Sequence, residues 1–83
     1  MTELTEQIRK ILVEHGRLQK DAATLPDTAD LYQAGMTSHA SVNVMLALEG
    51  AFDVEFPDHM LKRSVFESIA SMREAIQELT EAA

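Results

Sequence analysis

Ser38 and His39 are the residues of this chain whose types and order first suggest chemistry. They stand directly before an apolar segment, in the stretch AGMTSHASVNVMLALEGAF of residues 34–52. A serine in that place most often caps a helix, because its side-chain oxygen accepts a hydrogen bond from a backbone N–H of the first turn. It can also be a nucleophile or the attachment point of a covalent group. The local sequence leaves these three roles open.

A catalytic serine with His39 as its base is the weakest of the three roles. Adjacent residues on a helix point about 100 degrees apart, so the imidazole would not face the hydroxyl. No strand is predicted before Ser38 to form the strained turn of serine hydrolases, and no third residue can be identified from spacing to orient His39. The other histidines, His15 and His59, do not stand at metal-ligand spacings with it, so no metal site is predicted.

The composition restricts the partners and the compartment. The chain has 83 residues, with 14 acidic residues against 7 Lys and Arg residues and a net charge of -7. That charge repels phosphate backbones and anionic membranes, so neither a nucleic acid nor a membrane is an expected partner. The absence of cysteine excludes disulfides and thiolate metal sites. We expect a single domain over residues 1–83, monomeric and cytoplasmic, because a chain of this size supports one core and its apolar runs are too short to span a bilayer.

Apolar spacing predicts an all-helical protein with three longer helices and one short helix. The first helix is expected at about residues 3–15, the second at 38–52 and the short one at 59–63. The last begins at Ser68, or at Ser64 if the sequence SVFE forms a capping box. The apolar residues behind the longer helices are Leu4, Ile8, Ile11 and Leu12, then Val42, Met45, Leu46, Leu48 and Phe52, and finally Ile69, Met72, Ile76 and Leu79.

Residues 16–37 form a long connection before the second helix. Turn-forming residues are dense there, and no helical period is sustained. A loop of roughly 20 residues is unusually long between two helices and is tolerated only where it is held against a core. The residues able to hold it are Leu18, Leu25, Leu31, Tyr32 and Met36.

The segment ADLYQAGMTSHASVNVMLALEGAFDVEFPD, residues 29–58, resembles the acyl and peptidyl carrier protein family. Asp30 leads to Gly35, and Ser38 follows three residues after this glycine, as in the family's approach to its modified serine. The part LALEGAFDVEFPD is similar to the family's sequence before its short third helix. Thr37 and His39 stand where most fatty-acid carriers have Asp and Leu. By its patterns GMTSHASV and FDVEFPDHMLKRSVFESI, the chain resembles most closely the small stand-alone bacterial carriers that are loaded with amino acids.

This resemblance implies a four-helix bundle that is not itself an enzyme. It implies that Ser38 bears 4′-phosphopantetheine, attached from coenzyme A by a phosphopantetheinyl transferase, and that this arm holds an amino acid or acyl group as a thioester. It also implies loading by an amino acid:carrier protein ligase that resembles an aminoacyl-tRNA synthetase, and delivery to an acceptor enzyme that the sequence does not identify. The residues expected to contribute to partner recognition are Met36, Thr37, His39, Val44 and Met60, with Val44 on the outward side of its helix.

The alternative function belongs to another class of protein. An acidic helical adaptor would bind a partner peptide in a hydrophobic groove, and Ser38 would then be only a helix cap. The two functions differ in the mass of the protein, because only a carrier gains a covalent arm.

Overall fold

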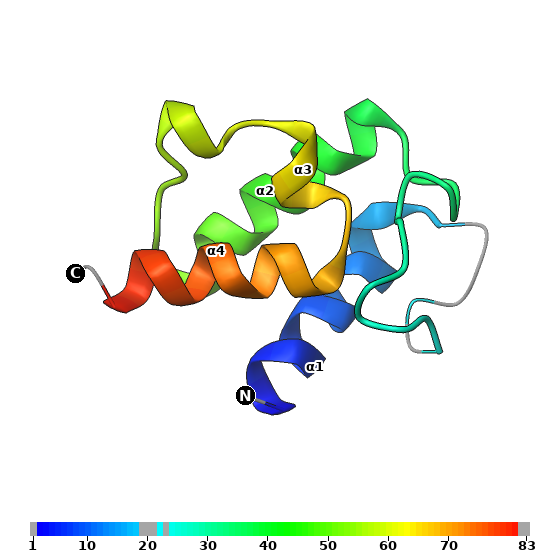
Figure 1. The fold of residues 1–83 in the computed structure, drawn as a ribbon, viewed down its shortest axis with the longest axis horizontal. Helices are drawn as coiled ribbons and strands as arrows, with labels where there is room; N and C mark the ends of the chain where they lie inside the picture. Colours follow the sequence, from blue (N-terminus) through cyan, green and yellow to red (C-terminus); the bar gives the residue numbers. More distant parts are fainter. Residues whose placement is uncertain (1, 19–21, 23, 82–83) are drawn as a thin grey trace.

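The protein is described here by a computed structural model over residues 2–18, 22 and 24–81, and within these residues it contains helices and no strand. The elements are α1 (Thr2–Ile11), a π-helical turn η1 (Leu12–Gly16), α2 (Ser38–Phe52), a 3₁₀ turn η2 (Asp58–Met60), α3 (Arg63–Phe66) and α4 (Ile69–Glu81). Helix α4 packs against α1 and α3, and η1 packs against α2 (Figure 1). The predicted four-helix architecture, with three longer helices and one short one, is confirmed. None of the helices in the described ranges is long and apolar enough to cross a membrane.

The core is formed by side chains of the longer helices and of the long loop. Its fully buried large side chains come from α1, η1, the loop, α2 and α4, and they are Ile8, Leu12, Leu31, Val44, Leu48, Ile69, Met72 and Ile76. The predicted stripes of the first and last helices are confirmed, since Leu4, Ile11 and Leu79 also pack against this core. So do the expected loop anchors Leu18, Leu25 and Tyr32. The expected helix over residues 3–15 is formed by α1 and the π-helical turn η1 together, and it ends at Gly16, before Arg17 takes a left-handed conformation with φ of 52°.

The buried side of α2 matches the predicted one only in part: Leu48 is buried, and Met45 and Phe52 pack against the core as expected. Ala40, Val44 and Leu48 face the core, whereas Val42 and Leu46 are 50% and 54% exposed. The expectation that Val44 faces outward is therefore wrong. Every residue from 42 to 48 except Asn43 is apolar, so apolar spacing alone did not determine which side of the helix is buried.

The short helical segment also differs from its expected range of 59–63. Met60 anchors η2 and Phe66 anchors α3, while Leu61 and Lys62 between them have non-helical backbone angles. The ring of Phe66 meets that of Phe56 edge to face at 5.3 Å between centroids. Because Met60 and Phe66 are buried separately, the segment forms two short turns instead of one helix.

Of the two possible starts for the last helix, the structure selects Ser68. Its Oγ accepts a hydrogen bond from the Ser71 backbone N–H at 3.1 Å, which is the geometry of a helix cap. The capping box from Ser64 is not formed, because α3 already begins at Arg63 and has no side-chain cap.

Asp27 ties the long loop to two helices. Its carboxylate accepts hydrogen bonds from Arg9 Nη2 at 2.6 Å and from Arg73 Nη1 at 2.9 Å, so it joins α1 to α4. Its backbone oxygen accepts a further bond from Ala70 N at 2.9 Å. The hydrogen bond from Arg73, together with the charge of Arg9, holds the pKa of Asp27 below its ordinary value of 3.8. The loop is thus fixed by polar contacts as well as by its apolar anchors.

We expect Asp27→Asn to lower the free energy of unfolding at neutral pH. The loss should be about 1 kcal/mol rather than several, because the side chain remains 37% exposed and water screens both ion pairs. A pKa that is lowered in the folded protein stabilises it above the ordinary pKa, and this stabilisation is lost as the pH falls through the folded value. The difference between wild type and variant should therefore be constant from about pH 6 to 8 and should shrink below about pH 4.

Urea unfolding at a series of pH values measures this difference. Glu55→Gln is the matched control, because Glu55 is an exposed acid outside this cluster. A loss for Asp27→Asn that stayed the same at about pH 3 would contradict the ion-pair explanation.

Candidate functional site

A hydrogen-bonded turn leads the long loop into α2. Asp30 Oδ1 accepts a hydrogen bond from Tyr32 N at 2.9 Å, and Leu31 O accepts one from Met36 N at 3.0 Å. Leu31 N donates to Glu67 O at 2.7 Å, and its side chain is fully buried. These contacts fix the turn to the segment that joins α3 and α4.

Gly35 ends this turn with φ of 114°, a backbone angle that L side chains rarely adopt. The next residue, Met36, places its side chain in the core. The chain then emerges at Thr37 and Ser38, which are both exposed. The turn therefore explains why the long loop delivers Ser38 to the surface at the first position of a helix.

Thr37, and not Ser38, caps α2. Thr37 has an extended backbone, and its Oγ1 accepts a hydrogen bond from Ala40 N at 3.0 Å. Ser38 is already the first helical residue, so its hydroxyl is not in the capping position. Within the described part of the chain this hydroxyl makes no hydrogen bond, although Ser38 O accepts one from Ser41 Oγ at 2.7 Å. The interpretation of Ser38 as the helix cap is therefore wrong.

Ser38 lines a groove of about 380 Å³ between α2 and the start of α3. Val42 and Met45 form the α2 wall, and Leu61 and Phe66 form the opposite wall. Two cations, Lys62 and Arg63, also line the groove, and the Arg63 guanidinium lies 4.0 Å from the centre of the Tyr32 ring. The groove is apolar along its walls and positively charged at one side.

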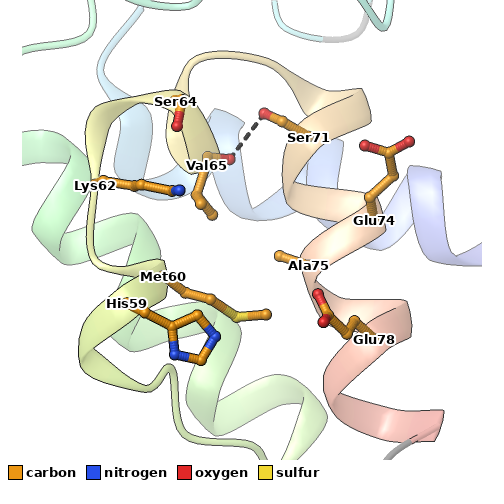
Figure 2. A pocket seen from close by; sticks show the side chains of 9 residues that line it. All are labelled: His59, Met60, Lys62, Ser64, Val65, Ser71, Glu74, Ala75 and Glu78. Carbon is orange, nitrogen blue, oxygen red and sulfur yellow. Dashed lines mark hydrogen bonds between the residues drawn. The ribbon is translucent and has the colours of Figure 1, made fainter.

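A second cavity, of about 300 Å³, lies between the η2–α3 segment and α4 and does not include Ser38. Figure 2 shows Glu74 and Glu78 on α4 across from Lys62 and His59. Lys62 lines both cavities, so the segment that contains it separates them. No set of three or more His, Cys, Asp or Glu side chains in the described residues could hold a metal ion.

The residues expected to recognise partners divide into two groups. Thr37 and His39 are exposed beside Ser38, and Met36 and Val44 are buried in the core. Met60 is also largely buried but lines the second cavity. The burial of Met36 and Val44 opposes direct contact with a partner, and recognition by the other residues stays a prediction. The sequence reasoning missed the exposure of Val42 and Leu61, which line the groove, and of Leu46 on α2.

Helix α2 has a single acidic residue, Glu49, and it is already engaged in the fold. Its Oε2 accepts a hydrogen bond from Phe56 N at 2.9 Å. The surface of α2 therefore presents apolar and polar side chains, and its one carboxylate is already hydrogen-bonded within the protein.

This site fits a group attached through a phosphate. The Ser38 hydroxyl is exposed and has no competing partner in the described residues. It stands at the N-terminus of a 15-residue helix, where unpaired N–H groups and the positive end of the helix dipole favour an anion. The adjoining groove provides apolar surface for the rest of an attached chain.

Comparison with known proteins gives a consistent result. Residues 4–76 match the model of the family described as phosphopantetheine attachment site. The chain is 47% identical over 70 residues to the aminoacyl carrier protein of Agrobacterium fabrum, and the match covers 84% of each protein.

Two solved structures are similar in fold. One contains a carrier protein from Agrobacterium tumefaciens with an engineered Bradyrhizobium japonicum glycine:carrier protein ligase and AMP. Its TM-score is 0.85 at 45% identity, and the match covers 88% of this chain and 97% of the other. Another contains the Bradyrhizobium japonicum ligase with a glycylated carrier protein, with a TM-score of 0.71, 27% identity and the same two coverages.

Proposed function

Because this chain belongs to the family of carrier proteins with a phosphopantetheine attachment site, we propose that Ser38 is its attachment residue. The observation that carries the proposal is the division of roles at the start of α2. Thr37 caps the helix, and the neighbouring Ser38 hydroxyl is left exposed and unbonded in the described structure. In this proposal residues 1–83 act as one carrier domain, and the arm is bound covalently after transfer from coenzyme A.

The protein's own contribution to attachment is to present the hydroxyl and to accommodate the phosphate. The N–H groups of the first turn of α2 and the helix dipole stabilise the added negative charge. No base is hydrogen-bonded to Ser38 among the described residues, so a phosphopantetheinyl transferase must supply the proton acceptor. We therefore propose that the chain is a substrate of other enzymes and not an enzyme. When bound, the arm supplies the thiol that this cysteine-free chain lacks.

We propose an amino acid as the cargo. The support is the 47% identity to an aminoacyl carrier protein and the similarity to a carrier protein that is glycylated in its complex with a ligase. Glycine is accordingly the first amino acid to test, with an amino acid:carrier protein ligase as the loading partner. The adaptor alternative is less well supported, because Ser38 does not serve as a cap.

The proposed location is the cytoplasm, where a free thiol on the arm stays reduced. We propose that the carrier is a monomer there, because a net charge of -7 opposes association of identical chains. Sedimentation of the modified protein at ordinary salt tests the oligomeric state.

The cargo linkage can be tested directly. The modified protein, incubated with ATP, glycine and the Bradyrhizobium japonicum ligase, should gain one glycyl residue in mass. Mild hydroxylamine should remove it, because a thioester is cleaved under conditions in which an amide is stable. Unmodified protein is the control and should gain nothing. Carrier isolated from its host with only long acyl chains on the arm would contradict the amino-acid cargo.

A further inference from the structure

The groove beside Ser38 has a charge opposite to that of the protein as a whole. The chain has 14 acidic residues and 7 Lys and Arg residues, yet the groove is lined by Lys62 and Arg63 and by no acidic residue. Neither cation forms an ion pair with a carboxylate in the described part of the chain. Lys62 faces the second cavity, across from Glu74 and Glu78 (Figure 2), so Arg63 is the cation that is complementary to an anion on the proposed attachment residue.

Arg63 is held in a defined place within this groove. Its guanidinium lies 4.0 Å from the centre of the Tyr32 ring, a distance typical of a cation–π contact. Tyr32 is itself fixed, because its backbone N–H donates to Asp30 Oδ1 and its side chain packs against the core. Stacking occupies one face of the guanidinium and leaves its in-plane N–H groups available to an acceptor.

We propose that Arg63 is a positioning residue that binds the phosphodiester of the arm on Ser38. In the absence of a partner the arm then lies in the groove against Val42, Met45 and Leu61. This inference rests on the proposed function, since it requires the arm on Ser38. The planar donors of a guanidinium match phosphate oxygens, and the groove volume of about 380 Å³ is within the range of small-molecule sites.

Amide spectra of the unmodified and modified proteins test this proposal. Attachment should shift the amide signals of Met45 and Leu61, on both walls of the groove, as well as those next to Ser38. In Arg63→Gln the ratio of bound to free arm should fall about two- to five-fold, the range expected for one exposed charge pair. Lys10→Gln removes the same charge from an exposed site in the last turn of α1 and should behave as wild type.

Three further measurements separate positioning of the arm from a purely structural role. In unmodified Arg63→Gln the spectrum should differ from that of wild type only around residues 32 and 63, so a change at Met45 appears only after modification. Tyr32→Leu, which keeps an apolar side chain but removes the stacking, should weaken arm binding in the same direction. Added salt should also reduce the Met45 and Leu61 shifts in the modified wild type.

Intact mass and amide shifts together distinguish the possible failures. A protein that gains no arm when treated with coenzyme A and a transferase overturns both the proposed function and this inference. A modified protein whose shifts are confined to residues 37–39 overturns only the inference, because the arm is then free in solvent. Equal groove shifts in wild type and Arg63→Gln would show that apolar contact alone holds the arm.

Discussion

Ser38→Ala is expected to abolish attachment of phosphopantetheine while leaving the free energy of unfolding nearly unchanged. The change in stability should stay within about 0.5 kcal/mol, because the lost hydroxyl is exposed and does not cap α2. Thr37→Ala should have the opposite pattern. It removes the acceptor of the Ala40 N–H and should cost about 1 kcal/mol, yet it keeps the Ser38 hydroxyl and should still permit attachment.

Intact mass after treatment with coenzyme A and a transferase measures attachment, and urea unfolding measures stability. Ser41→Ala is the matched control, because Ser41 lies one turn further along α2 and should leave attachment intact. Full modification of Ser38→Ala would exclude Ser38 as the site. A stability loss in Ser38→Ala without one in Thr37→Ala would contradict the assignment of the cap.

Leu46→Glu is expected to raise the KM for loading by the ligase about ten-fold or more, the size of effect seen for a central contact at a protein interface. Leu46 is 54% exposed on α2, next to the turn that presents Val42. The single acid of this helix, Glu49, is engaged by Phe56 N, so an interface on α2 must use apolar and neutral contacts. A new glutamate would place an unpaired charge in that contact.

This substitution distinguishes apolar from charge-based recognition. If the ligase instead recognises α2 through acidic residues, Leu46→Glu should lower the KM. Val13→Glu is the matched control, because Val13 is an exposed valine on η1 outside α2. Apolar recognition also predicts only a modest change of KM between low and high salt, since salt screens charge pairs and not apolar contact. A steep rise of KM with salt would contradict it.

Much of the fold could be predicted from the sequence, because the apolar residues of the first and last helices lie on one side of each helix. The apolar stripe around Ile8 and Leu12 was predicted correctly, since most positions between residues 2 and 10 that face away from it are polar. The same holds for Ile69 and Met72 in α4. Helix α2 gave the opposite result, because it is apolar on nearly every side and its orientation is set by contact with η1. Tertiary packing, and not periodicity, placed Val44 inside.

The sequence predicts Ser38 as the attachment residue, and this stays a proposal. The backbone angle at Gly35 and the burial of Met36 explain how the loop brings Ser38 to the surface. The cap was assigned one residue too late, because Thr37 and Ser38 are both good caps and only the backbone angles decide between them. The stacking of Arg63 on Tyr32 joins residues 31 positions apart, which no local pattern reveals.

Mass spectrometry of the protein isolated from its native host tests the central claim most directly. Fragmentation should place one phosphopantetheine, alone or bearing an amino acid, on Ser38. The same spectra should show the other serines next to the site, Ser41 among them, unmodified. Protein found only with the plain chain mass, or with an arm on a residue other than Ser38, would contradict the claim that this chain is a carrier modified at that position.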